Sequence, residues 1–165
     1  MWYEIEVERD DDGTLLVTVP AFPGVSTFSK TIDAAPRCAQ AAIEEAIAAR
    51  MADREELPHP EAKQENRGYW SEVTLLTYIK SLLYMLCRTE GLTRADLARL
   101  LRVRRETVDR LFRLEHESKL SQFERAFQAI GYPFSLGTIH APRAGRPESV
   151  TWGRWDRPSA STCDC

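Results

Sequence analysis

Hydrophobic and polar positions alternate strictly at the start of the chain. The alternation covers residues 3–7, stops at the polar segment 10–13 and resumes over residues 15–19. A period of two residues indicates strands with one buried face, and the glycine of segment 10–13 can take the positive φ of a hairpin turn. Segment 20–24 contains two prolines and ends the second strand, so residues 25–29 are predicted as a third strand.

The spacing of apolar residues then changes to that of a helix. The predicted helical face comprises Ile32, Ala35, Ala39, Ala42, Ile43, Ala46 and Ile47. We expect Asp33 rather than Thr31 to be the N-cap, because Pro36 then falls in the first turn, where its missing N–H is harmless. Residues 70–76 are rich in β-forming side chains and predict a fourth strand. The resulting order predicts a small α+β layer with the helix covering one face of the sheet.

Helical spacing dominates the second half of the chain. Residues 78–88 form one predicted helix, and Gly91 suits the position just after its C-terminus. Residues 92–112 predict two short helices joined by a tight turn, and residues 120–130 predict a last one. Four helices are therefore expected between about residues 78 and 136, forming an all-α domain.

The two short helices have the pattern of a helix-turn-helix. Thr93 and Asp96 can cap the first helix reciprocally. The buried faces are predicted to comprise Leu97, Ala98, Leu100 and Leu101 in the first helix, and Val108, Leu111 and Phe112 in the second. Many such motifs carry glycine where this chain has Arg102. A left-handed arginine costs about 1 kcal/mol, so we expect a turn of different geometry there.

The second of these helices presents basic and polar side chains outward: Arg104, Arg105, Glu106, Thr107, Asp109 and Arg110. In a helix-turn-helix, this helix enters the major groove of DNA. The pattern therefore predicts DNA binding, and the alternative is an ordinary helical bundle with a solvated charged face.

The charge distribution divides the chain in the same way. Residues 1–67 contain fourteen acidic and seven basic residues, whereas residues 68–165 contain eleven acidic and fifteen basic ones. The overall net charge of −3 is therefore the sum of an acidic first half and a basic second half. The basic half suits phosphates, and the acidic half suits a basic protein.

Composition argues against several other classes. The apolar stretch 73–87 is interrupted by Lys80 and is too short to span a bilayer, and the chain starts without the pattern of an export signal. Cys38 and Cys87 are expected to be buried apolar residues, and Cys163 and Cys165 fall in a polar tail. The three histidines show no metal-ligand spacing. We expect a soluble, cytoplasmic protein without metal or cofactor.

Both halves together resemble one known family. The N-terminal motifs are DDDG and LLVTVPAFPGV before an Ala-rich helix, and the C-terminal ones are GLTRADLARLLRV, TVDRLFRLEHESKL and FERAFQAIG. In this order they are similar to the HicB antitoxins of toxin–antitoxin systems, in the branch with a C-terminal helix-turn-helix. The resemblance covers about residues 3–136. Two departures, Ser29-Lys30 in place of a common Gly-Asp and an unexpected Pro36, bear on where the helix starts.

The resemblance implies a domain plan. Residues 1–76 would form a partial ribonuclease-H-like β-β-β-α-β domain that binds the toxin, with residues 53–68 as a loop or linker. Residues 77–138 would form the helix-turn-helix domain. The resemblance does not cover residues 139–165, including Trp152 and Trp155, and their content of Pro, Ser, Arg and Gly predicts a disordered tail.

The resemblance also implies two partners. The acidic domain would bind and mask a small basic ribonuclease toxin, HicA, by charge complementarity, and the other domain would dimerise on a palindromic operator and repress the operon. The resemblance does not decide between a homodimer and a tetramer as the oligomeric state. Base or phosphate contacts are expected from Arg104, Arg105, Glu106, Thr107, Asp109 and Arg110, since arginine can bond guanine and an acid can accept from cytosine. Thr93 and Arg94 are expected to contact phosphate.

An enzymatic function is not expected. Glu8 and residues 10–12 lie in one hairpin turn, without the additional carboxylates that a two-metal site needs, and no phosphate loop or nucleophile motif is present. The alternatives are a stand-alone DNA-binding regulator with a ligand-sensing N-terminal domain and a metal-dependent nuclease.

Overall fold

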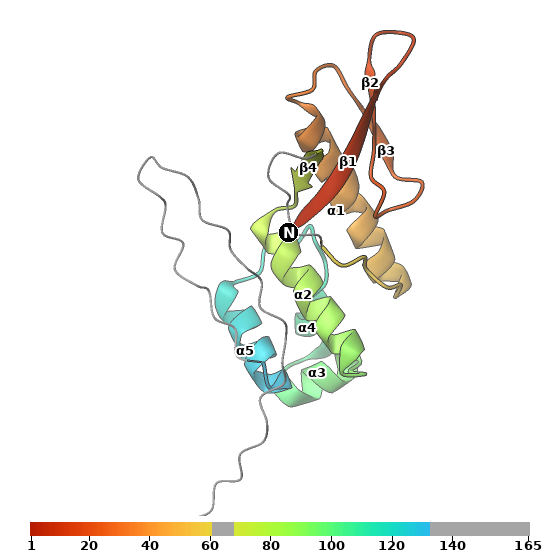
Figure 1. The fold of residues 1–165 in the computed structure, drawn as a ribbon. Helices are drawn as coiled ribbons and strands as arrows, with labels where there is room; N and C mark the ends of the chain where they lie inside the picture. Colours follow the sequence, from red (N-terminus) through yellow and green to blue (C-terminus); the bar gives the residue numbers. More distant parts are fainter. Residues whose placement is uncertain (61–67, 133–165) are drawn as a thin grey trace, which may run out of the picture. The chain divides into compact units, whose positions relative to one another are not determined.

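A computed structural model describes residues 1–60 and 68–132 of the chain. These residues contain a four-stranded sheet and five helices, so the α+β class is confirmed (Figure 1). In chain order, the elements are β1 (Trp2–Arg9), β2 (Leu15–Thr18), β3 (Ser26–Ser29), α1 (Ala35–Asp53), β4 (Tyr69–Glu72), α2 (Leu75–Thr89), α3 (Arg94–Leu101), α4 (Arg105–Leu111) and α5 (Leu120–Ile130).

The sheet is antiparallel, with the strand order β3-β2-β1-β4. The predicted hairpin joins β1 to β2 through Gly13, which has a φ of +86°. Strand β4 pairs with the other side of β1, with Tyr3 opposite Ser71. The fourth strand was predicted over residues 70–76, but it ends at Glu72 because Thr74 caps the next helix by accepting the backbone N–H of Thr77.

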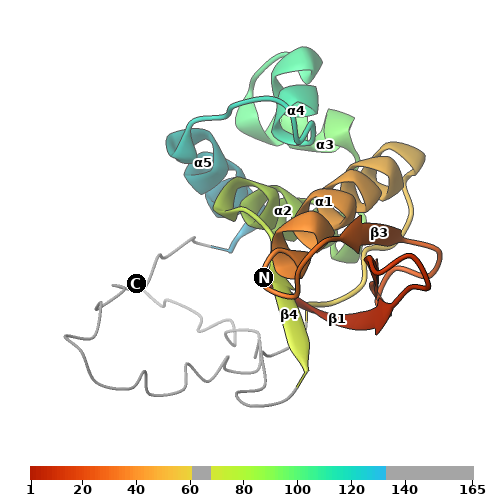
Figure 2. The same ribbon diagram turned by 90° about the horizontal axis from the view of Figure 1, so that it is seen from above.

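Helix α1 lies along one face of this sheet, as predicted (Figure 2). Its buried residues Ala39, Ile43 and Ile47 pack in one core with Tyr3 and Val17 of the strands. The Ser71 hydroxyl of β4 donates to the Pro36 carbonyl of α1 at 2.7 Å. These contacts bury the alternating apolar positions of β1 and β2, which is why their sequences have a period of two.

The start of α1 differs from the prediction. The N-cap is Ala34, without a side-chain hydrogen bond, and Pro36 lies in the first turn. A separate turn precedes the helix, in which the Thr31 carbonyl accepts the N–H groups of Ala34 and Ala35. The Thr31 hydroxyl also accepts the Ala34 N–H at 3.3 Å. The expected cap at Asp33 was therefore wrong by one residue, because this turn shifts the helix start.

The four helices of the second half are present where the pattern predicted them, and α2 starts three residues earlier than expected. Gly91 and Gly131 have positive φ values of +64° and +97° just after α2 and α5. Both are conformations that glycine adopts readily at helix C-termini.

The described residues, 1–60 and 68–132, all belong to one compact unit. The predicted boundary between residues 76 and 77 stays a prediction. The predicted tail, with Trp152, Trp155, Cys163 and Cys165, lies outside the described residues.

Candidate nucleic-acid interface

Helix α3 begins with the predicted capping box. The backbone N–H of Thr93 donates to Asp96 Oδ2 at 2.9 Å, and the Asp96 N–H donates to Thr93 Oγ1 at 3.2 Å. The Thr93 hydroxyl also donates to the same carboxylate. These bonds, from the hydroxyl first, lower the pKa of Asp96 below its ordinary value, and Arg99 adds a smaller effect. The sequence pattern thus fixes where the helix begins.

The connection between α3 and α4 is a three-residue turn, 102–104. Arg102 adopts the left-handed conformation, with φ 54° and ψ 44°, and its N–H donates to the carbonyl of Arg99. Val103 follows, and its N–H donates to the Ala98 carbonyl. The expectation of a different turn was therefore wrong, because the αL conformation is present at an arginine and its cost is of the order of 1 kcal/mol.

The apolar faces of the two helices meet as predicted except at Leu100, and Leu101 is half-buried rather than buried. Leu97, Val108 and Leu111 are almost completely buried. Leu100 was predicted to be buried but is 49% exposed. In an eight-residue helix the buried face is narrow, and Leu97 with Ala98 already fills it.

Arg94 connects the start of α3 to its surroundings. Its guanidinium lies 3.3 Å from Asp109 Oδ1 of α4 and 5.1 Å from the ring centre of Phe112. It also donates to the carbonyl of Met51 in α1 at 3.5 Å. Arg105 lies 3.9 Å from the other oxygen of Asp109. Two predicted DNA contacts, Arg94 and Asp109, are thus engaged with each other in this conformation.

The other side chains predicted to contact DNA are mostly exposed to solvent. Arg104, Arg105, Glu106 and Arg110 are exposed, and Thr107 is half-buried. Thr93 is exposed, but its hydroxyl is occupied in the capping box.

Two further arginines belong to this surface, although the sequence argument did not include them. Arg102 is exposed in the turn, and Arg99 is exposed and pairs with Asp96 at 2.6 Å. The three-residue spacing of Asp96 and Arg99 was the signal that could have identified that pair.

Lys80 of α2 supports the segment that follows α4. Its side chain is fully buried, and its ammonium group donates to the carbonyls of Arg113 and His116. Burial lowers the pKa of Lys80, while the nearby Glu115 carboxylate raises it. A buried charge between two carbonyls fixes the path of the chain from α4 towards α5.

The carboxylates of the β1–β2 turn have local roles. Asp10 Oδ1 accepts the N–H of Asp11 at 2.8 Å, and Asp12 Oδ1 accepts both the N–H and the hydroxyl of Thr14. The bonds from Thr14 lower the pKa of Asp12. Over residues 1–60 and 68–132, no three His, Cys, Asp or Glu side chains are placed to hold a metal ion.

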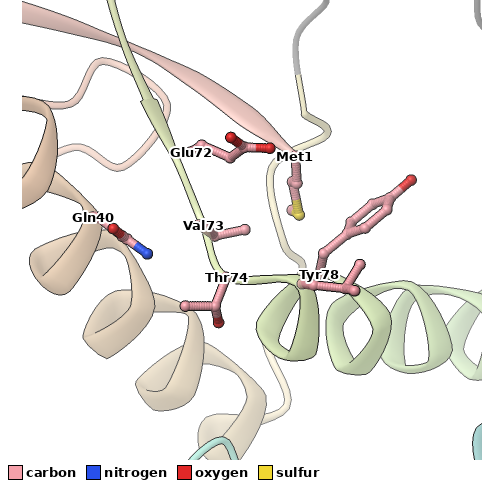
Figure 3. Close-up of a pocket in the computed structure, with 7 residues that line it drawn as sticks. Met1, Gln40, Glu72, Val73, Thr74 and Tyr78 are labelled. Carbon is pink, nitrogen blue, oxygen red and sulfur yellow. The ribbon is translucent and has the colours of Figure 1, made fainter. Parts of the chain in front are cut away.

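A cavity of about 370 Å³ lies where β4 leads into α2. Figure 3 shows Gln40 of α1, Glu72 of β4 and Tyr78 of α2 around it. Thr74 borders the same space, and its backbone N–H donates to Glu44 Oε1 at 2.7 Å. None of the predicted site residues lines this cavity. No described helix has the length and apolar character that crossing a membrane requires.

Comparison with known proteins gives consistent matches. A family model described as the HicB-like antitoxin of bacterial toxin–antitoxin systems matches residues 2–81. Antitoxin HicB of Pseudomonas fluorescens (strain Pf0-1) is 30% identical over 129 residues, which are 78% of this chain and 88% of that protein. Antitoxin HicB 2 of Photorhabdus laumondii subsp. laumondii is 31% identical over 84% of this chain and 97% of its own length. Antitoxin HicB of Escherichia coli (strain K12) is 26% identical over 82% of this chain and 98% of its own.

Proposed function

This chain belongs to the HicB family of antitoxins, and from that premise we propose that it neutralises a small HicA-type toxin that cleaves mRNA. We further propose that it represses its own operon, as a homodimer or tetramer, through a helix-turn-helix formed by α3 and α4. The antitoxin role follows from the family, whereas the HicA-type partner and the DNA-binding role are proposals. The protein acts by binding, without catalysis.

The observation that carries the DNA-binding proposal is the surface of α3, the turn and α4. Residues 93–113 contain seven arginines against three acidic residues. Six of the arginines, at positions 99, 102, 104, 105, 110 and 113, are exposed, while Leu97, Val108 and Leu111 on the apolar side of the two helices are buried. Exposed arginines on one side of such a helix pair suit phosphate and guanine contacts.

The proposed contacts have different tasks. Arg104, Arg105 and Arg110, with Glu106 and Thr107 between them, form the base and phosphate contacts, and Thr93 is retained as a phosphate contact. The Arg94–Asp109 pair sets the position of α4 on α3, and either partner reaches DNA only by exchanging this pair.

The DNA-binding proposal is tested with labelled DNA from upstream of the gene, by fluorescence anisotropy at fixed salt. We expect Arg104→Ala combined with Arg105→Ala to weaken binding roughly tenfold or more, since each well-placed arginine contributes about 1–3 kcal/mol. Arg37→Ala, on the exposed side of α1, is the matched control and should bind like the wild type. Wild-type affinity in the double variant would overturn the proposal.

The toxin proposal is tested by co-expression with the neighbouring genes. A small protein should co-purify in a fixed ratio, arrest growth when expressed alone and be harmless together with this chain. If no neighbouring product binds, the proposed toxin partner is wrong.

A stand-alone regulator that senses a ligand is the second candidate. The cavity beside Gln40, Glu72 and Tyr78 is the feature in its favour, because its volume is in the range of small-molecule sites. Such a regulator would bind the upstream DNA without any co-purifying toxin.

A further inference from the structure

The sheet has a second face, which no described helix covers (Figure 2). Ser71 contacts α1, and Tyr3 and Val17 are buried in the core with α1, so the intervening residues point to the other side. We call this side, where β1, β2 and β3 meet, the open face. It comprises Glu6, Glu8, Leu16, Thr18, Ser26 and Phe28.

The strand register arranges these six residues in two rows. Glu8 pairs with Leu16, and Leu16 pairs with Phe28, so one row runs from a carboxylate to two apolar side chains. Glu6, Thr18 and Ser26 form the neighbouring row. The open face is therefore acidic on β1 and apolar towards the edge strand β3.

The apolar end of the open face is exposed. Phe28 is 57% exposed, the largest exposed fraction among the described aromatic side chains, and Leu16 beside it is half-buried. Because more than half of the Phe28 side chain stays in water, its burial contributes little to the stability of the isolated fold. It does supply the apolar anchor that protein interfaces use.

The acidic end is exposed, and its two carboxylates form no ion pair with a described residue. Glu6 and Glu8 point to the same side of β1, and no Lys, Arg or His among the described residues forms an ion pair with either. Like charges close together on one strand face repel each other. A partner that brings positive charge removes this repulsion, which the fold itself leaves in place.

We propose that the open face is the docking surface for the toxin partner and that the partner presents lysine or arginine side chains beside an apolar contact. This inference rests on the proposed function, because it names the surface through which that partner binds. The basic side chains meet Glu6 and Glu8, and the apolar contact covers Phe28. Charge complementarity of this kind mainly accelerates association and selects the partner.

The charge requirement is tested on the full chain, co-expressed with its neighbouring toxin and purified as the complex. We expect Glu6→Lys combined with Glu8→Lys to weaken toxin binding at least about tenfold, with association slowed most at low salt. Glu45→Lys combined with Glu56→Lys makes the same charge change at exposed positions in α1 and just after it. This control should bind as the wild type does, and thermal unfolding should show both variants folded.

The apolar requirement is tested separately. Phe28→Ala should also weaken binding about tenfold, whereas Leu75→Ala, at a residue that is 61% exposed elsewhere, should not. If the wild type binds the toxin and the open-face variants bind equally well, the docking surface is wrong while the toxin partner stands. If the wild type binds no toxin, the proposed function fails and this inference fails with it.

Discussion

Replacing Lys80 by methionine tests what holds the segment after α4 in place. Methionine keeps most of the volume and flexibility of the lysine stem, so the change removes the ammonium group without opening a large cavity. In the wild type this group donates to the carbonyls of Arg113 and His116. The variant leaves both carbonyls without this donor.

The size of the effect follows from those two bonds. A hydrogen bond to a charged group contributes about 1.5–3 kcal/mol. We take the lower value for each bond, because removing the lysine also removes the cost of burying its charge. The expected loss is about 3 kcal/mol, equivalent to a fall of roughly 6–12 °C in Tm for a chain of this size.

Urea unfolding and thermal scans at pH 7 measure this loss. Lys30→Met, at an exposed lysine, is the control and should change stability by less than about 0.5 kcal/mol. Amide hydrogen exchange should also accelerate over residues 113–119 more than over β1. If Lys80→Met is within about 0.5 kcal/mol of the wild type and exchange is unchanged, the buried ammonium does not hold this segment and the reasoning is refuted.

Two further substitutions test the network around α3 and α4. Arg94→Ala should destabilise the fold by about 1–2 kcal/mol in urea unfolding, because it removes a half-exposed ion pair with Asp109 and a stacked contact with Phe112; a loss no larger than that of Asp109→Asn alone would show that the ring contact contributes nothing. Asp96→Asn should be less stable than the wild type near neutral pH, and this difference should shrink as pH falls below 3.8. The sign follows because the pKa of Asp96 is lower in the folded state, so its stabilisation is present above the unfolded value and is lost on protonation; a difference that stays constant down to pH 2.5 in denaturation curves would contradict it.

The local features of the fold could be predicted from the sequence. The alternation in β1 and β2, the Thr93–Asp96 capping box and the helix end at Gly131 each depend on residues a few positions apart. The failures were also local but involved competition between neighbours. Thr31 starts a turn that moves the helix N-cap from the expected Asp33 to Ala34. Leu100 is exposed because Leu97 and Ala98 already fill the narrow buried face of α3.

Contacts between distant segments could not be predicted in the same way. Lys80 bonds carbonyls 33 and 36 residues away, and Arg94 reaches Met51 across 43 residues. A lysine within an apolar helix pattern was visible in the sequence, but its partners are backbone carbonyls, which carry no sequence signal. The candidate DNA contacts were therefore chosen by pattern alone, and that pattern could not separate exposed arginines from bonded ones.

The distribution of arginines shows why charge counting overstates the basic surface. The last carbonyls of a helix lack partners within it and carry partial negative charge, so they attract cations. At the end of α1, Arg94 donates to the carbonyl of Met51, and Arg88 donates to that of Arg54. Arg94 also pairs with Asp109 of α4, so in this conformation its guanidinium connects α1, α3 and α4. If the proposed DNA binding holds, the exposed arginines should contribute more to its salt dependence than Arg94, whose charge is paired with Asp109.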